Sequence, residues 1–336
     1  MNKRKSKLSE LEVFSGISIL CVVLIHCNAY YLLNILNLET YEQAHFYTRL
    51  LDNFVHGAVP MFIFISGYKY ALNNIDDSYK EFVLKKIKRV IKPFFIINMI
   101  FFLENIIFNF ENYTIKKAII EFIYILVGYS RAYQLWYIPM YIFIVVTYPI
   151  LYKRVRNDKI RICIILLILF GQYMLSLKFS ILSRYPFKFV YYYLFFEMGV
   201  IFYKFSLKDI IYKYYIQIII IYILSVIILT FNFIPNMYTV IRIYYLNPLS
   251  IIAYYALSLI LINNKLFNYL GRYSFYIFLL HEPIICMGIS NKFKSLGIYN
   301  SMSYVFVVCI LTFIATIILY KIIENTFIKN ILFYQK

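Results

Sequence analysis

Two histidines lie inside strongly apolar stretches of this chain: His26 within residues 11–33 and His281 within residues 274–289. Ionisable side chains are costly in the hydrocarbon of a bilayer, so they usually face a protein interior, a partner or a water-filled cavity. A neutral imidazole has a pKa close to neutral pH and can remove a proton from a hydroxyl nucleophile. The two residues therefore indicate proton chemistry, or polar binding, within a membrane.

The composition of the chain supports a membrane location. Of its 336 residues, 62% are hydrophobic and 15% are charged, whereas a soluble domain is about 45–50% apolar. Stretches of about 20 apolar residues recur along the sequence, and each can cross the bilayer as a helix. The first stretch, 11–33, is longer than a signal-peptide core and has no clear cleavage site after it, so it predicts an uncleaved span. We expect an all-α, polytopic membrane protein.

The apolar stretches predict ten membrane-spanning helices, at 11–33, 54–73, 90–109, 134–152, 160–177, 187–204, 214–232, 245–263, 273–290 and 302–323. The segment 116–129 is too short to span and predicts an interfacial or re-entrant helix. Most of the 34 Lys and Arg residues fall in alternate loops, including 153–161. The positive-inside rule then places both termini in the cytoplasm.

The net charge of +18 follows from this topology, because basic loops lie beside an anionic inner leaflet. It requires no nucleic acid, although a polyanionic ligand in the cytoplasm could use the same loops. The spacing of the cysteines matches neither a disulfide framework nor a metal site, so we expect no bound metal. These cysteines are Cys21, Cys27, Cys163, Cys286 and Cys309.

Five polar segments interrupt the apolar stretches in a characteristic order. They are Gly16 to His26, the run Phe64-Ile65-Ser66-Gly67-Tyr68, the pair Lys86 and Arg89, the run Leu135-Trp136-Tyr137, and Gly271-Arg272-Tyr273-Ser274 continuing to His281-Glu282-Pro283. Together these segments resemble the acyltransferase 3 family of bacterial integral-membrane acyltransferases. The chain looks most like members that decorate exported polysaccharides, including the intercellular-adhesin O-succinyltransferase type.

The resemblance implies one integral-membrane domain over residues 1–336, located in the plasma membrane. It implies transfer of an acetyl or succinyl group from acyl-CoA, a co-substrate rather than a resident cofactor, to a hydroxyl of an exopolysaccharide or lipid-linked glycan of the cell envelope. The expected partners are this donor, the glycan acceptor, the lipid bilayer and polysaccharide synthase or export proteins, with no nucleic acid.

Under the resemblance, His26 and His281 are the expected catalytic residues. His26 deprotonates the acceptor or carries the acyl group transiently, and His281 assists. Ser66 and Tyr68 are candidate donors to a developing oxyanion. The remaining expected substrate-binding residues are Lys86, Lys88 and Arg89, which would hold donor phosphates, and Trp136, Arg272, Ser274 and Glu282.

The chain departs from the family pattern at two positions. Ser15 stands where the family usually has arginine, eleven residues before His26 and so about 16 Å along the same helix face. Lys69, Lys86 or Arg272 could supply the missing cation. Lys86 also replaces the first arginine of the loop pair, giving a point charge in place of a bidentate fork.

Other interpretations stay open at this point. Each buried histidine could only bridge helices by hydrogen bonds, and Ser66-Gly67 could only permit close helix packing. Trp136 could be an interfacial anchor, Lys69 could extend to the membrane surface, and His56 is expected to be a solvated residue beside an outer loop. At the level of function, the alternatives are a glycan or small-metabolite transporter or flippase, or a catalytically silent component of an export complex.

Overall fold

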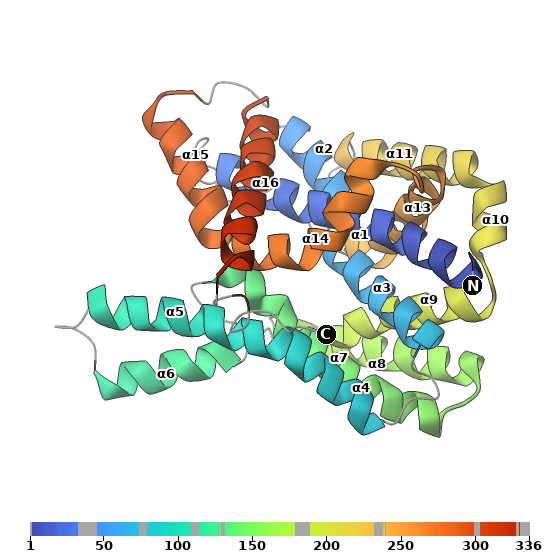
Figure 1. The fold of residues 1–336 in the computed structure, drawn as a ribbon. Helices are drawn as coiled ribbons and strands as arrows, with labels where there is room; N and C mark the ends of the chain where they lie inside the picture. The colour runs from blue at the N-terminus through green and yellow to red at the C-terminus, as the bar shows by residue number, and fades with distance from the viewer. Residues whose placement is uncertain are drawn as a thin grey trace. The chain divides into compact units, whose positions relative to one another are not determined.

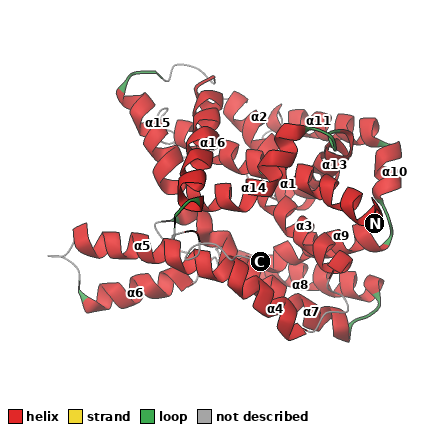
Figure 2. Cartoon of the chain, in the orientation of Figure 1, coloured by secondary structure: helices red, strands yellow, loops and turns green. Residues whose placement is uncertain are grey.

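The computed structural model describes residues 2–32, 46–73, 79–108, 114–126, 128, 132–178, 189–231, 238, 240–298, 303–326 and 329. Over these residues the secondary structure is helical, without a strand (Figures 1 and 2). The all-α prediction is therefore confirmed.

Seven helical stretches among the described residues are long and apolar enough to cross a membrane. They are Ser9–Tyr30, Phe46–Leu72, Tyr79–Phe108, Tyr133–Arg154, Arg242–Ile260, Lys265–Ser295 and Ser303–Glu324. A shorter apolar helix covers Tyr215–Phe231. These stretches establish a multi-pass membrane protein, while the count of ten spans and the cytoplasmic termini stay predictions.

The chain divides into two compact units, residues 1–65 with 205–320 and residues 66–204 with 321–336. Helix α3 (Ala58–Asn73) contributes to both, and most of α16 (Ser303–Glu324) belongs to unit 1. The other helical segments of unit 1 are α1 (Asn2–Tyr30), α2 (Phe46–Val55), α10 (Lys208–Lys213), α11 (Tyr215–Phe231), η6 (Arg242–Leu246), α13 (Asn247–Ile260), α14 (Lys265–Leu280), η7 (His281–Ile285) and α15 (Cys286–Ser295).

Unit 1 is built around the pairing of α1 with α14, which two glycines make possible. A Cβ at Gly16 would lie 2.2 Å from the carbonyl oxygen of Phe267, and a Cβ at Gly271 would lie 1.8 Å from that of Glu12. Small residues of this kind let helix backbones approach closely. His26 and His281 each follow the crossing glycine of their own helix by ten residues. The crossing therefore sets the relative height of the two histidines.

A side-chain cap and an aromatic pair also stabilise the helices of unit 1. The Asn264 side chain caps α14 by accepting a hydrogen bond from the backbone N–H of Phe267 (3.1 Å). The rings of Phe14 and Phe64 lie edge to face, with centroids 5.8 Å apart. Such pairs add to the burial energy of the rings themselves, and they fix α1 against the first part of α3.

Among the described residues, unit 2 contains the helical segments α4 (Tyr79–Lys86), η2 (Ile87–Ile91), α5 (Lys92–Phe108), α6 (Ile115–Leu126), η4 (Tyr133–Trp136), α7 (Tyr137–Arg154), α8 (Asp158–Lys178) and α9 (Phe189–Lys204). Helices α5 and α6 lie side by side (Figure 1), joined by a hydrogen bond from Asn105 Nδ2 to Glu121 Oε2 (2.8 Å). With twelve residues, α6 is too short to span a bilayer, as expected for segment 116–129.

Candidate active site

The two histidines of the apolar stretches lie against each other in unit 1. Their ring centroids are 5.1 Å apart, with the ring planes inclined by 58°. His26 comes from α1 and is half-buried, whereas His281 begins η7 and is fully buried. Two imidazoles are thus in contact although 254 residues separate them in the chain.

The backbone around His281 fixes its hydrogen-bonding state. Nδ1 donates to the carbonyl oxygens of Ile277 (3.0 Å) and Phe278 (2.9 Å), so this nitrogen carries the hydrogen. Nε2 then holds the lone pair of the neutral ring. Within the described part of the chain, Nε2 is buried and has no hydrogen-bond partner. The arrangement presents a buried imidazole lone pair that can accept a proton.

Pro283 explains why the helix changes direction at this point. A residue before proline is driven out of the helical region, and Glu282 accordingly has extended torsions (φ −128°, ψ 156°). Its buried carboxylate turns toward α1, where Oε2 accepts a hydrogen bond from the Tyr30 hydroxyl (2.9 Å). Tyr30 was not anticipated from the sequence, although its position four residues after His26 puts both on one helix face.

Two buried thiols, each close in sequence to one of the histidines, lie in contact. The sulfur atoms of Cys27 and Cys286 are 3.5 Å apart, and both residues are free cysteines. Each follows one of the histidines in the chain, Cys27 directly and Cys286 after five residues. A free cysteine packs as a small hydrophobic residue with a weakly polar S–H group.

Arg272 and Ser274, the other expected site residues of unit 1, and Ser15 at the departure from the family pattern each have a partner other than the histidines. Arg272 is exposed, and its Nε is 3.3 Å from an oxygen of Glu12. The hydroxyl of Ser274 donates to its own helix at Gly271 (2.8 Å), and that of Ser15 donates to Leu11 (2.7 Å). The two hydroxyls are satisfied locally, and Arg272 is engaged at the surface with Glu12.

A cation near the start of α1 comes instead from a residue the sequence did not single out. Glu10 is fully buried, accepts a hydrogen bond from the Tyr255 hydroxyl (3.1 Å), and pairs with Lys208 of α10. This charge pair links α10 to α1, the helix that carries Ser15 and His26. No motif in the sequence signals it, because α10 and α1 are nearly 200 residues apart.

The expected donor-binding residues belong to unit 2. Lys86 Nζ donates to the Tyr141 hydroxyl (2.9 Å) and lies 5.6 Å from the centroids of the Phe82 and Tyr141 rings. Lys88 and Arg89, on η2, are exposed. Of the three basic side chains, two therefore present their charge to the surroundings while the third is held by an aromatic pair.

Ser66, Tyr68 and Trp136 also lie in unit 2. A Cβ at Gly67 would lie 2.0 Å from the carbonyl oxygen of Phe196, so the Ser-Gly pair does permit close packing of α3 on α9. Tyr68 is buried edge-on to Tyr203 (centroids 5.5 Å apart). The Trp136 ring lies 6.0 Å from that of Tyr192.

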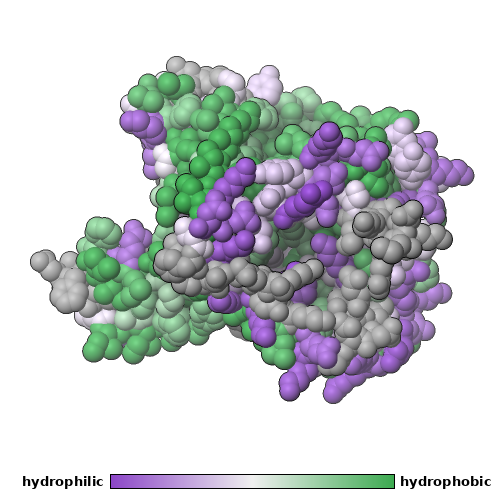
Figure 3. Space-filling model, in the orientation of Figure 1, coloured by the Kyte–Doolittle hydropathy of each residue, from purple (hydrophilic) through white to green (hydrophobic). Residues whose placement is uncertain are grey.

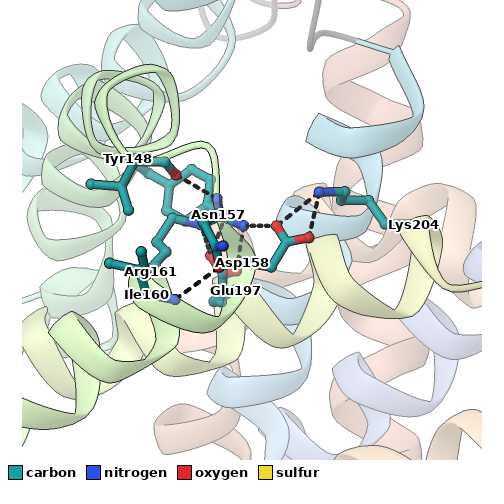
Figure 4. Close-up of polar contacts among 8 residues, drawn as sticks. Tyr148, Asn157, Asp158, Ile160, Arg161, Glu197 and Lys204 are labelled. Atoms are coloured by element: carbon teal, nitrogen blue, oxygen red, sulfur yellow. Dashed lines mark hydrogen bonds and ion pairs between the residues drawn. The ribbon is translucent and has the colours of Figure 1, made fainter.

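The most heavily paired charges of unit 2 form a cluster on α7, α8 and α9 (Figure 4). Arg161, fully buried, donates from Nε and Nη2 to the two carboxylate oxygens of Glu197 (2.7 and 2.6 Å). The Tyr148 hydroxyl donates to the same carboxylate, and Asp158 bridges Arg161 and Lys204. The sequence groups Arg161 with the basic residues of the loop 153–161. The fold instead buries it, and a bidentate pair of this kind holds α8 to α9.

Asp158 at the start of α8 is tuned by this cluster. Partial burial acts to raise the pKa of its carboxyl, but the hydrogen bonds from Lys204 and Arg161 outweigh burial and hold the pKa below the ordinary 3.8. The carboxylate is therefore ionised at neutral pH and contributes to the link between helices.

A second cluster corrects the expectation for His56. Its side chain is 34% exposed and lies between two charges: Nε2 is 3.0 Å from Nη2 of Arg242, and Nδ1 is 3.6 Å from Asp52. Guanidinium only donates, so Nε2 accepts. Arg242 also pairs with the buried Asp52. His56 is thus part of an ion cluster that ties α2 to η6.

Comparison with known proteins gives one result. The model of the acyltransferase 3 family, described as an acyltransferase domain, matches residues 8–321. No curated protein matches the chain. No solved structure matches it. The matched range contains both histidines and every residue expected to form the site.

Proposed function

This chain belongs to the acyltransferase 3 family and is a multi-pass membrane acyltransferase, and we propose that it transfers an acetyl or succinyl group from acyl-CoA to a hydroxyl of an exported polysaccharide or lipid-linked glycan. The proposed site of action is the plasma membrane. The observation that supports this chemistry is the contact between His26 and His281. Because Nδ1 of His281 carries the hydrogen, its Nε2 carries a lone pair that can accept a proton.

The proposed reaction is a direct acyl transfer. The acceptor hydroxyl gives its proton to an imidazole nitrogen while its oxygen attacks the carbonyl carbon of the thioester. The tetrahedral intermediate then collapses, the carbon–sulfur bond breaks, and the leaving thiolate of CoA takes up the proton. The products are an ester of the acceptor and free CoA, and the imidazole returns to its neutral form.

The two histidines have complementary positions for this step. Nε2 of His281 carries a lone pair because the hydrogen of the ring is on Nδ1, which donates to backbone carbonyls. His26 is the more exposed ring of the pair. In the proposal, Nε2 of His281 takes the proton, and His26 contacts the incoming hydroxyl. These roles are the reverse of those expected from the sequence, in which His26 is the base or carries the acyl group transiently and His281 assists.

Basic side chains of η2 are proposed to hold the phosphates of the donor. Lys88 and Arg89 are exposed, and Arg89 offers a planar fork that suits phosphate oxygens. Lys86 is engaged with Tyr141, so its expected contribution is to shape this segment. Because such contacts are electrostatic, binding of the donor should weaken as ionic strength rises.

The proposal is tested by acyl transfer with the purified protein in lipid nanodiscs. Radiolabelled acetyl-CoA and succinyl-CoA are supplied separately with a hydroxyl-bearing glycan, and release of CoA is followed together with labelling of the glycan. We expect His281→Ala and His26→Ala each to lower kcat/KM by about 10²- to 10⁴-fold, the usual contribution of a general base.

His56→Gln is the matched control, because His56 is a half-buried histidine of the same unit outside the imidazole pair. It should keep transfer per folded molecule near the wild-type rate. Full activity in both His26→Ala and His281→Ala would contradict the proposed chemistry. Counterflow of a glycan in liposomes, with no release of CoA by the wild type, would identify a transporter instead.

A further inference from the structure

Helix α16 has two distinct faces. One face is apolar and exposed, with Ile310, Ile314 and Ile318 at successive turns, and apolar residues cover this helix in the view of Figure 3. The other face carries Thr312 and Thr316, both 0% exposed. The two threonines are one turn apart and therefore lie on the same side of the helix.

The hydroxyls of these threonines are unusual for this chain. Among the described residues, neither Oγ1 atom has a hydrogen-bond partner of ordinary geometry. Buried serine and threonine in a helix commonly donate to the carbonyl four residues earlier. In the described part of the chain, the hydroxyls of Ser15, Ser18 and Thr230, which are buried, and of Thr147 and Ser225, which are not, make this bond. Thr316 instead has a buried donor with no acceptor among the described residues, and Thr312 reaches only the thiol of Cys286, which is a weak acceptor. Such a donor costs free energy unless a ligand accepts from it.

The polar face of α16 contacts the two cysteines that accompany the histidines. The Thr312 side chain is a neighbour of the Cys286 thiol, and Cys309, one turn earlier, is a neighbour of Cys27. Cys27 directly follows His26, and Cys286 lies against Glu282, the residue after His281. All of these residues belong to unit 1. The unused donors and the unused lone pair of His281 are therefore parts of one buried polar region.

We infer that Thr312 and Thr316 donate hydrogen bonds to the carbonyl oxygen of the acyl thioester. The inference rests on the proposed function. The lone pair at Nε2 of His281 can accept a hydrogen bond from the hydroxyl of the glycan substrate. The threonine hydroxyls can in turn donate hydrogen bonds to the carbonyl oxygen of the thioester. As the carbonyl carbon is attacked, negative charge grows on this oxygen, and fixed donors stabilise it. The role given to Ser66 and Tyr68 from the sequence thus has a second set of candidates beside the histidines themselves.

The test uses paired substitutions at both positions in the full-length protein. Valine keeps the shape of threonine but removes the hydroxyl, whereas serine keeps the hydroxyl. For Thr312→Val with Thr316→Val we expect kcat to fall about 10²-fold or more, as when an oxyanion donor is removed, with KM for acetyl-CoA changed much less. Thr312→Ser with Thr316→Ser should retain most of kcat.

Thermal stability gives a second readout that a structural role would move in the opposite direction. Because the Thr316 hydroxyl has no partner among the described residues and the Thr312 hydroxyl has only a weak thiol partner, the valine variant should have a Tm equal to or above that of the wild type. Thr230→Val is the control, since the Thr230 hydroxyl donates to Val226 and accepts from Asn53. That variant should lose Tm while keeping kcat per folded molecule.

Three results would overturn the inference: an unchanged kcat in the valine variant, an equal loss of kcat in the serine variant, or a fall in Tm together with kcat in the valine variant. Failure of the proposed function is distinguishable, because then the wild type itself releases no CoA and labels no glycan. In that case the assignment of the threonines to a thioester falls with it.

Discussion

At His281, two backbone carbonyls decide what the side chain can do. A histidine that donates from Nδ1 to its own helix keeps the lone pair on Nε2, so the ring is a base without a separate carboxylate to orient it. The nearby carboxylate of Glu282 is hydrogen-bonded to Tyr30 instead. The sequence His281-Glu282-Pro283 alone does not show whether the histidine is oriented by backbone carbonyls or by a carboxylate.

Asp158 yields a pH prediction at the scale of single residues. Its pKa in the folded protein lies below the ordinary 3.8, held there by Lys204 and Arg161. A depressed pKa contributes stability that is present above the ordinary value and is lost as pH falls through the folded pKa. We therefore expect Asp158→Asn to lower Tm at pH 7, with the gap to the wild type closing as the pH is lowered below about 4.

Thermal unfolding of the detergent-solubilised protein, recorded from neutral pH to the acid limit of solubility, measures this gap. Lys204→Met is a companion variant that removes the partner while leaving the carboxyl in place. A gap between wild type and Asp158→Asn that stays constant at every pH would show that the carboxylate does not contribute through its charge.

At the scale of helices, the crossing of α1 and α14 is the feature on which the histidine pair depends. A Cβ at Gly16 or Gly271 would meet backbone carbonyl atoms, which cannot rotate away as a side chain can. The helices would have to separate, and the rings ten residues further on would separate with them. Elsewhere in the chain, Gly171 and Gly288 have open space where a Cβ would be placed.

This contrast gives a matched test. Gly16→Ala and Gly271→Ala should each destabilise the protein, by about 1–3 kcal/mol as for other overpacked sites, and should reduce acyl transfer. Gly171→Ala and Gly288→Ala should leave Tm unchanged or slightly higher, because alanine favours a helix. Tm and CoA release are measured on all four variants. Equal effects at the crowded and the open glycines would mean that the close crossing does not position the histidines.

At the scale of the whole molecule, the number of membrane crossings, odd or even, decides whether the two termini lie on the same side of the membrane. Seven long helices among the described residues would leave the termini on opposite sides, whereas the shorter apolar helix Tyr215–Phe231 makes eight and the addition of α8 and α9 makes ten. Either even number agrees with the distribution of Lys and Arg, from which we predict that both termini are in the cytoplasm.

Topology reporters test this prediction. Green fluorescent protein fused at either terminus should fluoresce in cells, since it folds in the cytoplasm. Fusion after residue 298, between α15 and α16, should give no fluorescence, while alkaline phosphatase at the same point should be active. Opposite signals at the two termini would require an odd number of crossings and a revised assignment of the short helices.

The sequence by itself determined the membrane class, the helical fold, the family and the two histidines, because these depend on composition, on runs of apolar residues and on local motifs. It did not determine the partners of charged and polar side chains. His56 was expected to be solvated and Arg161 was counted with a basic loop, but both lie in ion clusters, and no motif in the sequence singled out Thr312 or Thr316. Only the tertiary structure decided these, because burial and pairing are set by residues distant in the chain. The contact between His26 and His281 is of the same kind, since it depends on the helices that two glycines bring together.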